Sequence, residues 1–356
     1  MSVTIRDVAR ACGVHISTVS RTFSAPHLVN PNTRSRVLTC AEQLGYRPNR
    51  AARALITGRT YNIGLIVADI ANPFFPPLIK AAESQARKHD HHVFVADSNE
   101  DPAVEEEVVR ALAKQVDGIL LVSPRMSNTL IEQLSREVPL VVVNRQIPGM
   151  PAVVMDVAQG ARLAIEHLTG LGHRSIALLG GPRGSWTSRE IRRSATATAR
   201  AGRAALTVLG PNAPTEVGGL AVAADVLRAG ATAVLAYNDL MAIGLIEGLF
   251  AAGARVPRDV SVVGIDDIML SRLTRPKLTT VATPTAAAGR AAVDMLLANG
   301  EQRGEHGRAR HGDDRRTTAH VHLETELVIR DSTGPGPGPH SPADPGDVIA
   351  PGGVAS

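Results

Sequence analysis

Short runs of apolar residues alternate with longer amphipathic segments from about residue 61 to residue 332. Runs such as 62–68 and 118–122 are almost wholly apolar, which is typical of strands that are buried on both faces of a parallel sheet. In segments such as 75–88, apolar residues recur every three or four positions, as in a helix that covers a sheet. The alternation predicts an α/β fold of parallel sheets with helices on both faces.

The pattern predicts more strands than one small open sheet holds. Strands are expected at 62–68, 92–96, 118–122, 140–144, 176–179, 233–237, 261–265 and 321–329, and the clearest helices at 75–88 and 102–114. We therefore expect two doubly wound lobes. Ligands of such folds bind at the carboxyl ends of the strands, so the loops that follow the strands are the candidate site.

The first 25 residues have the pattern of two short helices packed across a tight turn. The first helix is expected to begin at Thr4, with Asp7 three residues later in a capping-box arrangement. Gly13 can adopt the left-handed conformation that a tight turn requires. The apolar positions that hold the two helices together are Ile5, Val8, Ala9, Cys12 and Val19.

The second helix leaves a mostly polar face exposed. That face carries Ile16, Ser17, Ser20 and Arg21. A helix-turn-helix that exposes such a face is typical of proteins that read the DNA major groove. The distribution of charge supports this interpretation. Residues 1–60 contain nine arginines and two acids, which gives them a net charge of +7. The whole chain has a net charge of +4, so the remaining residues carry −3. A basic head on a mildly acidic body suits phosphate binding.

A third helix and a basic segment complete the head. The helix is expected to begin at 30–33 and to end at Gly45. The following segment, 46–59, contains helix formers but is too short to form a stable helix alone. It is either a basic linker or a helix that forms only on DNA, with Leu55 wedged into the minor groove.

Length and composition limit the class of protein to which the chain can belong. A chain of 356 residues with 44% hydrophobic residues can bury more than one core. Neither a signal peptide nor a membrane-spanning run is found, so the protein is expected in the cytoplasm. Cys12 and Cys40 lie on apolar faces of the head, and we interpret them as small buried apolar residues rather than as a redox switch.

Several short motifs of the head form a specific combination. They are Thr4-Ile5, Asp7-Val8-Ala9, Gly13-Val14, Thr18-Val19-Ser20-Arg21, Gly45-Tyr46 and Pro48-Asn49. With these motifs, the head and linker resemble those of the lactose-repressor (LacI/GalR) family of bacterial transcription regulators. Residues 61–332 resemble the two-lobed, periplasmic-binding-protein-like core of the same family, which has doubly wound parallel sheets.

The resemblance implies which residues contact DNA. Base-edge contacts are expected from Ile16, Ser17 and Arg21, and phosphate contacts from Thr18, Ser20, Arg50 and Arg53. Leu55 would enter the central minor-groove step of a palindromic operator. His15 stands where the family usually has a serine that caps the recognition helix, and a phosphate contact is its alternative role. Thr4 and Asn49 complete the expected set of DNA-binding residues.

The same resemblance implies that an effector binds between the lobes. Phe74 and Phe75 would form an aromatic wall, although Phe75 can equally begin the core face of a helix. Hydrogen bonds to ligand hydroxyls or amines are expected from Asn144, Asn238 and Asp266.

A second group of effector residues is expected after the fifth strand. It comprises Ser185, Trp186, Arg189 and Arg192. Trp186 is as consistent with packing in the core or between lobes as with stacking on a sugar ring. Relatives with sugar effectors usually carry an arginine nine residues after the Pro of the Gly-Pro loop, where this chain has Ile191. Either a neighbouring arginine substitutes, or this clamp is absent.

The predicted organisation has four parts. They are a DNA-binding head at 1–46, a hinge at 47–60, a two-lobed effector-binding and dimerisation domain at 61–332 and a disordered tail at 333–356. The first lobe is expected at about 61–157 plus 286–318, and the second at about 158–285 plus 319–332. The basic stretch 299–319 is expected to be a flexible surface loop, with an auxiliary DNA contact as the alternative.

Metal, cofactor and catalytic sites are not expected. The histidine-rich stretch 88–92 lacks the spacing of a known metal site. The glycine-rich stretch 180–184 lacks the Gly-Lys-Ser/Thr of a phosphate-binding loop. No set of Ser, Cys, His and acidic residues forms a recognisable catalytic constellation.

The sequence therefore predicts a dimeric regulator, most often a repressor in this family, that binds a palindromic operator. A small-molecule effector, a sugar by default with nucleosides behind it, would control it allosterically. Two other classes use a similar core. If the chain were a solute-binding protein, we would expect a signal peptide and no basic head. If it were an enzyme on a doubly wound fold, we would expect a set of catalytic residues at the strand ends.

Overall fold

The computed structural model describes residues 3–24, 26–46, 59–306 and 319–337. The chain forms two compact units, one of Met1–Asn62 with Lys114–Asp117 and one of Ile63–Ala113 with Gly118–Ser356. Four expected DNA contacts, Asn49, Arg50, Arg53 and Leu55, lie outside the described residues, as does the expected tail from residue 338 onward.

The head contains the three predicted helices. They are α1 (Ile5–Ala11), α2 (Ile16–Ser24) and α3 (Pro31–Gln43), with a 3-10 turn, η1 (Pro26–Leu28), before α3. The carboxylate of Asp7 accepts hydrogen bonds from the backbone N–H of Thr4, at 3.0 Å, and from its hydroxyl, at 2.6 Å, which fixes the start of α1. The fully buried side chains Val8, Val19 and Val37, one from each helix, form the centre of the head's core.

The end of the linker is tied to the 114–117 loop. The carboxylate of Asp117 accepts hydrogen bonds from the backbone N–H of Thr60, at 2.6 Å, from the Thr60 hydroxyl, at 2.9 Å, and from the backbone N–H of Tyr61, at 2.9 Å. These bonds fix the point at which the chain enters its first strand.

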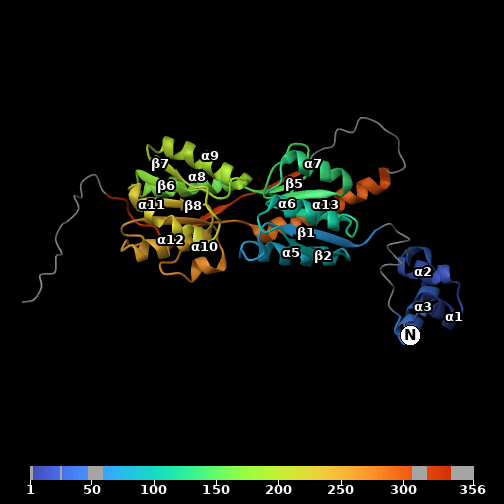
Figure 1. Cartoon of the computed structure of the whole chain (residues 1–356). Coiled ribbons are helices and arrows are strands. Elements are labelled where there is room, and N and C mark those ends of the chain that lie inside the picture. Colours follow the sequence, from blue (N-terminus) through green and yellow to red (C-terminus); the bar gives the residue numbers. More distant parts are fainter. Residues whose placement is uncertain (1–2, 25, 47–58, 307–318, 338–356) are drawn as a thin grey trace, which may run out of the picture. The chain divides into compact units, whose positions relative to one another are not determined.

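The first lobe is built on a six-stranded sheet of order β11-β5-β4-β3-β1-β2. Its strands are β1 (Asn62–Val67), β2 (His92–Asp97), β3 (Gly118–Val122), β4 (Leu140–Val143), β5 (Ala152–Met155) and β11 (His320–Leu323). Its helices are α5 (Phe75–Lys88), α6 (Pro102–Leu112), α7 (Asn128–Glu137) and α13 (Thr285–His306). Helices α5 and α13 share one apolar core with the sheet, and α6 and α7 cover the other face (Figure 1).

The second lobe repeats this architecture with the order β12-β10-β9-β8-β6-β7. Its strands are β6 (Ser175–Leu179), β7 (Ala205–Leu209), β8 (Ala233–Ala236), β9 (Ser261–Asp266), β10 (Thr279–Ala282) and β12 (Glu326–Val328). Its helices are α8 (Val157–Gly170), α9 (Trp186–Ala201), α10 (Glu216–Ala221), α11 (Ala223–Arg228) and α12 (Asp239–Ala251), with the 3-10 turn η2 (Met269–Arg272). Helices α8 and α9 share one core, and α11 and α12 share the other.

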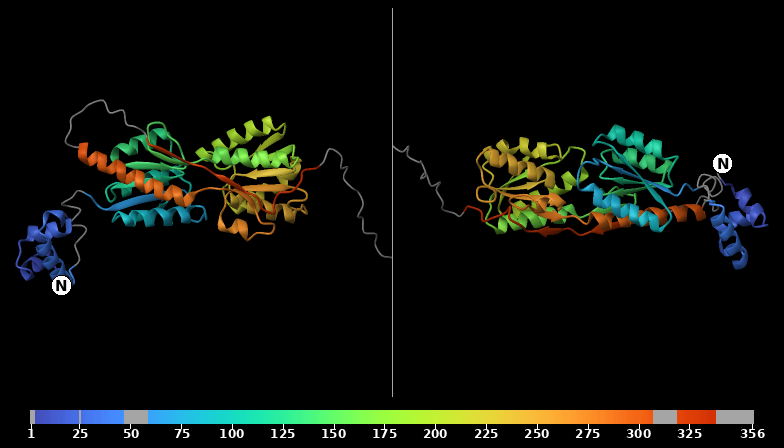
Figure 2. Two further views of the ribbon diagram at one scale, coloured as in Figure 1. Left: turned by 180° about the vertical axis from the view of Figure 1, so that it is seen from behind. Right: turned by 90° about the horizontal axis from the view of Figure 1, so that it is seen from below.

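The chain passes between the two lobes after β5, after β10 and after β11 (Figure 2). Two of these passages are bonded to each other, because the hydroxyl of Thr325 donates to the Asp156 carbonyl at 2.8 Å and its N–H donates to the Gln159 side chain at 3.0 Å. The predicted two-lobed α/β fold with doubly wound sheets is confirmed.

Three expectations about the C-terminal part are wrong. The single strand expected at 321–329 is two strands, and β11 pairs with β5 of the first lobe rather than belonging to the second. Residues 299–306 continue helix α13 and are not a loop. Residues 333–337 pack on the second lobe, where Gly336 N–H donates to the Leu171 carbonyl at 2.8 Å. Composition misjudged this glycine-rich segment because hydrogen bonds of its backbone, and of the Thr333 hydroxyl to His167 and Thr279, hold it without a packed apolar core.

Two searches of the described residues are negative. They contain no helix that is both long and apolar enough to cross a bilayer. They also contain no group of three His, Cys, Asp or Glu side chains that could bind a metal ion.

Candidate functional site

Helix α2 of the head presents the side chains that the sequence assigns to DNA. Val19 is fully buried against the other helices, whereas Arg21 is exposed and the Ile16 side chain keeps 39% exposure. An apolar residue left this exposed on a small domain is available for a contact with base methyl groups. Ser17, Thr18 and Ser20 are half-buried on the same helix.

His15 precedes α2 and supplies a cap from its ring. Its Nδ1 accepts a hydrogen bond from the backbone N–H of Ser17 at 3.3 Å and lies 2.8 Å from the Ser17 hydroxyl oxygen. Free N–H groups at a helix start need such an acceptor. The imidazole can therefore take the place of the serine that the family resemblance leads one to expect.

Burial of Cys12 suits the interpretation of the cysteines as core residues. The thiol donates to the Val8 carbonyl at 2.7 Å. Burial, with the neighbouring Cys40 as a further cause, raises the pKa of the Cys12 thiol to about 11, which disfavours the reactive thiolate.

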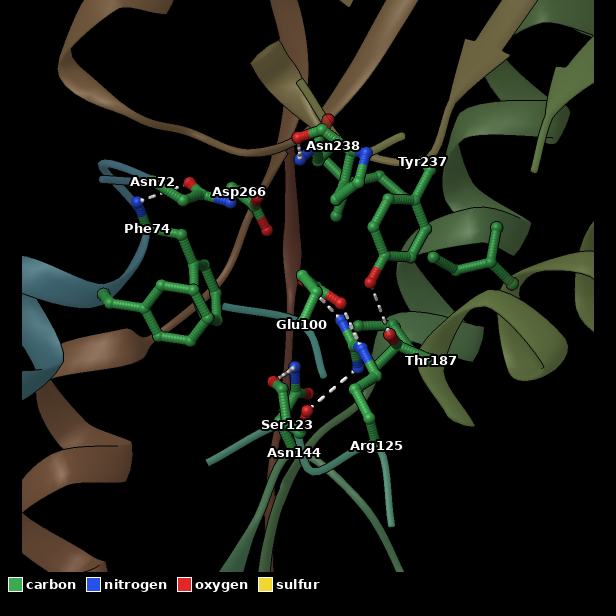
Figure 3. A pocket seen from close by; sticks show the side chains of 15 residues that line it. Asn72, Phe74, Glu100, Ser123, Arg125, Asn144, Thr187, Tyr237, Asn238 and Asp266 are labelled. Carbon is green, nitrogen blue, oxygen red and sulfur yellow. Dashed lines mark hydrogen bonds and ion pairs between the residues drawn. The ribbon is translucent and has the colours of Figure 1, made fainter. Parts of the chain in front are cut away.

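The second unit has a cavity where the carboxyl ends of both sheets meet, with a volume of about 440 Å³ including the space open to solvent. Its wall carries aromatic, aliphatic and polar side chains from both lobes (Figure 3). They are Asn72, Phe74, Phe75, Glu100, Ser123, Arg125, Asn144, Val157, Thr187, Ile191, Pro214, Tyr237, Asn238, Ile265 and Asp266. The position matches the ligand site expected of doubly wound sheets.

Four residues of this wall have a backbone conformation that residues other than glycine seldom adopt. Glu100, Ser123, Asn144 and Asp266 all have positive φ, at 60°, 52°, 61° and 121°. Such conformations carry a cost and recur at binding sites.

Arg125 and Glu100 form an ion pair in the wall of the cavity. Nε and Nη2 of Arg125 both donate to the Glu100 carboxylate, the second at 2.9 Å to Oε1, and Nη1 donates to the Ser123 carbonyl at 2.9 Å. The side chains are 6% and 26% exposed, so Arg125 is almost removed from water and Glu100 only partly so. Two parallel bonds give the guanidinium a fixed orientation.

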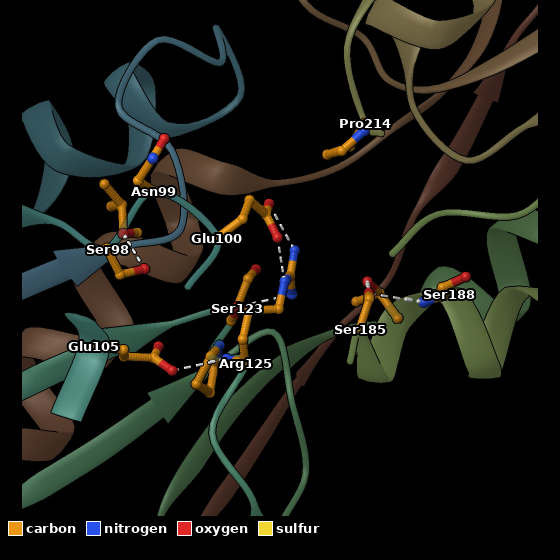
Figure 4. Close-up of polar contacts among 12 residues, drawn as sticks. Ser98, Asn99, Glu100, Glu105, Ser123, Arg125, Ser185, Ser188 and Pro214 are labelled. Atoms are coloured by element: carbon orange, nitrogen blue, oxygen red, sulfur yellow. Dashed lines mark hydrogen bonds and ion pairs between the residues drawn. The ribbon is translucent and has the colours of Figure 1, made fainter. Parts of the chain in front are cut away.

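The loop that carries Arg125 is clamped from behind by two buried charged residues. Oε2 of Glu105 accepts from the backbone N–H groups of Arg125 and Met126, each at 2.9 Å (Figure 4). Nη1 of Arg145 donates to the carbonyls of Pro124, at 3.0 Å, and Met126, at 2.7 Å. Burial raises the pKa of Glu105, while the bonds from the loop and the charges of the two arginines oppose that rise.

Tyr237 forms the opposite side of the cavity. Its hydroxyl hydrogen-bonds with Ser185 Oγ and Thr187 Oγ1, each at 3.1 Å. Ser185 also caps α9 by accepting from Ser188 N–H at 3.1 Å. The tyrosine ring is thereby fixed to the start of α9.

The two asparagines of the wall differ in what they offer a ligand. Asn238 caps α12 by accepting from Met241 N–H at 2.9 Å and donates to the Pro214 carbonyl at 2.9 Å. Asn144 donates to Ser123 Oγ at 3.1 Å, but its side-chain oxygen is buried without a partner. A buried acceptor without a partner is costly and is satisfied when a ligand donates to it.

Asp266 ends β9 beside a second buried acid, Asp239. The residue keeps some exposure to the cavity, but the protein desolvates its carboxyl, and this, with the nearby Asp239, raises the pKa of Asp266 well above its ordinary value. Burial likewise raises the pKa of Asp239 to about 7, against hydrogen bonds from Ser271, Thr280 and Ile268 that lower it.

The structure brings five of the nine predicted effector residues to the cavity. They are Phe74, Phe75, Asn144, Asn238 and Asp266. The rings of Phe74 and Phe75 meet edge to face with their centroids 5.0 Å apart. Ser185 is buried behind Tyr237, Trp186 is half-buried at the start of α9, and Arg189 and Arg192 are exposed. These four do not line the cavity, because the face of α9 that points inward carries Thr187 and Ile191.

Sequence reasoning missed the charged pair and its partner across the cavity, Tyr237. Arg125 lies three residues after the predicted strand 118–122 and Tyr237 is the last residue of the predicted strand 233–237, so the rule that strand ends and the loops after them form the site already covered both. Of the arginines near Ile191, neither Arg189 nor Arg192 lies in the wall of the cavity. An arginine of the first lobe, Arg125, lies in the wall instead.

A helix-turn-helix head followed by a two-lobed core with a polar cavity between its sheets defines the class of ligand-controlled DNA-binding regulators. Residues 4–49 match the bacterial regulatory proteins of the lacI family, and residues 165–333 match the periplasmic binding protein-like domain.

Individual relatives agree with this class. The transcriptional regulator GalS of Salmonella typhimurium is 35% identical over 309 residues, which cover 83% of this chain and 89% of GalS. The structure of the Lac repressor dimer bound to operator and the anti-inducer ONPF is similar, with a TM-score of 0.81, 27% identity and coverage of 94% of this chain and 100% of that one. The CelR–cellobiose complex gives a TM-score of 0.67 and 28% identity, with 93% and 99% covered.

The chain belongs to the lacI family of bacterial regulatory proteins. It is a DNA-binding transcriptional regulator and not an enzyme. Both alternative classes, a solute-binding protein and an enzyme on a doubly wound fold, are thereby set aside.

Proposed function

We propose that this protein represses transcription as a homodimer on a palindromic operator, and that a sugar in the cavity between the lobes controls its affinity for DNA. Its place of action is the cytoplasm, where its DNA is. The proposal rests on a basic head joined to a cavity whose wall is strained at four positions. Relatives with this architecture bind such partners: the Lac repressor structure is a dimer on operator, and CelR is in complex with cellobiose.

On DNA, α2 enters the major groove of one half-site in each subunit. Ile16, Ser17 and Arg21 touch base edges, and Thr18 and Ser20 touch phosphates. His15 caps the helix through its Nδ1, which directs the Ser17 N–H and side chain. The segment with Asn49, Arg50, Arg53 and Leu55 binds at the centre of the operator.

In the cavity, Phe74 and Phe75 cover an apolar face of the sugar. The unpartnered oxygen of Asn144 accepts from a ligand hydroxyl, and the carboxyl of Asp266, whose raised pKa favours the protonated form, donates to another. Sugars combine apolar C–H faces with hydroxyl groups that both donate and accept, and the wall offers both kinds of contact. A nucleoside is the second candidate, since the two phenylalanines can also stack on a base.

Fluorescence anisotropy with a symmetric operator duplex and a scrambled duplex tests the DNA-binding part. We expect the operator to bind at least 10³-fold more tightly. Arg21→Ala should lose discrimination at one base position, by about 1–3 kcal/mol. Arg53→Ala should instead weaken all sequences alike and reduce the salt dependence of binding. Equal affinity of the native protein for both duplexes would overturn the proposal.

A further inference from the structure

The wall of the cavity contains few groups that carry charge near neutral pH. Among the residues that line it, the acidic and basic side chains are Glu100, Arg125 and Asp266. Their arrangement decides which ligand charge the site accepts.

Arg125 is already neutralised by the protein. Two of its nitrogens donate to the Glu100 carboxylate and a third donates to the Ser123 carbonyl. With the clamp by Glu105 and Arg145, the loop keeps the guanidinium beside Glu100 and prevents it from turning toward a ligand anion. An anionic ligand would have to compete with Glu100 for the guanidinium and leave that partly buried carboxylate without its partner, which is costly.

The third group is an acid whose surroundings disfavour its charged form. The desolvated carboxyl of Asp266 lies beside Asp239, and both conditions favour its protonated form. A ligand cation would therefore meet a carboxyl at Asp266 whose charged form is disfavoured, and a carboxylate at Glu100 that is occupied by Arg125. The wall thus offers both hydrogen-bond donors and acceptors, while its one ion pair is already formed within the protein.

We propose that this site selects an uncharged polyol over its anionic and cationic analogues, and that the Glu100–Arg125 pair is the element that sets this selectivity. The proposal rests on the proposed function, since it takes a sugar as the ligand. Glu100 and Arg125 are then specificity-determining residues. The Glu100 carboxylate accepts from one ligand hydroxyl, and the Arg125 guanidinium donates to the next.

Two matched sets of sugars serve as probes. They are D-galactose, D-galacturonate and D-galactosamine, and D-glucose, D-glucuronate and D-glucosamine. Calorimetric titration of the full-length protein should show tighter binding of the neutral member of a set than of either charged member, by roughly tenfold or more, as expected for an unpaired charge near a desolvated pair.

Two single variants should shift this preference in opposite directions. Glu100→Gln releases the charge of Arg125 and should move the uronate-to-neutral affinity ratio toward the uronate by roughly tenfold or more. Arg125→Gln releases the charge of Glu100 and should move the amine-to-neutral ratio toward the amine. The double variant Glu100→Gln/Arg125→Gln carries neither charge, so its ratios should return to the native values.

The surface pair Arg162–Glu166 of α8 provides the matched control. Its side chains are 46% and 50% exposed, and the same Arg→Gln and Glu→Gln changes there should leave all ratios unchanged. Thermal melting confirms that each variant is folded, and the double variant keeps the test valid where a single variant is unstable.

Tighter binding of a charged probe by the native protein, unchanged ratios in both single variants, or no binding of any of the six sugars would each overturn this proposal. Operator binding by the same preparation is measured in parallel. Specific operator binding without sugar binding would contradict the selectivity while leaving the DNA-binding part of the proposed function intact.

Discussion

Gly181 lies directly against the ring of Tyr237: a Cβ on Gly181 would stand 2.6 Å from ring atoms Cδ2 and Cγ. Real Cβ atoms do not approach a ring so closely, so only glycine allows Tyr237 to reach Ser185 and Thr187. Gly181 belongs to the glycine-rich stretch 180–184, which lacks the residues of a phosphate-binding loop. Its role is to leave room for the ring of Tyr237, which lines the cavity.

Gly181→Ala should therefore displace the tyrosine ring. We expect an overpacking cost of about 1–3 kcal/mol in the free energy of unfolding, measured by urea denaturation. Gly170→Ala is the control, because Gly170 is the last residue of α8 and a Cβ there would meet nothing within 4 Å. Equal stability of the two variants would show that Tyr237 is not fixed by this contact.

Glu105 is expected to hold the loop that carries Arg125. Glu105→Ala leaves the backbone N–H groups of Arg125 and Met126 without their acceptor and removes a negative charge near Arg145, so urea denaturation should show a loss of about 2–5 kcal/mol. Glu105→Gln keeps an acceptor oxygen and should cost less. Glu107→Ala, on the exposed face of the same helix, should stay within about 0.5 kcal/mol of the native protein. A loss no larger than that control would contradict the clamp.

Asp239 should make the stability of the second lobe depend on pH. Its pKa is about 7 in the folded protein, whereas an unfolded aspartate titrates near 3.8. Its protonated form therefore contributes full stability below about pH 4, and this contribution is lost as the pH rises through about 7, by up to about 4 kcal/mol. Asp239→Asn cannot titrate, so the stability advantage of the native protein over this variant should shrink between pH 4 and pH 8. An advantage independent of pH would argue against the raised pKa.

His15 should stabilise the start of α2. Removal of its ring in His15→Ala leaves the Ser17 N–H without its acceptor and should cost about 1 kcal/mol, seen as faster hydrogen exchange of α2 amides in the full-length protein. His15→Ser should restore much of the protection. His27→Ala, at an exposed position of the same head, is the control, and an equal effect of both alanine changes would refute the capping role.

The fold was predictable where the sequence pattern reports burial directly. Continuous apolar runs such as 118–122 indicate strands covered on both faces, and these are the central strands of the two sheets. The change of sheet at residues 324–325 was not predictable, because apolar residues continue on both sides of it. What separates β11 from β12 is the pair of bonds from Thr325 to Asp156 and Gln159, which are distant in sequence.

The cavity was predictable only in part, for a similar reason. Asn144 and Asp266 end or directly follow strands, so the strand-end rule finds them. Glu100 and Arg125 look like solvated loop charges in the sequence and become significant only as a desolvated pair 25 positions apart. Arg189 and Arg192 show the converse, since they lie near a strand end but the helical turn of α9 directs them to solvent.

The most direct test of ligand-controlled DNA binding is an operator titration of the full-length protein with and without a saturating neutral sugar from the probe panel. We expect the operator Kd to change at least fivefold in one direction, and the sugar Kd to change by the same factor when operator is bound, because coupling between two sites is reciprocal. An operator Kd that is unaffected by a sugar shown to occupy the cavity would contradict the account.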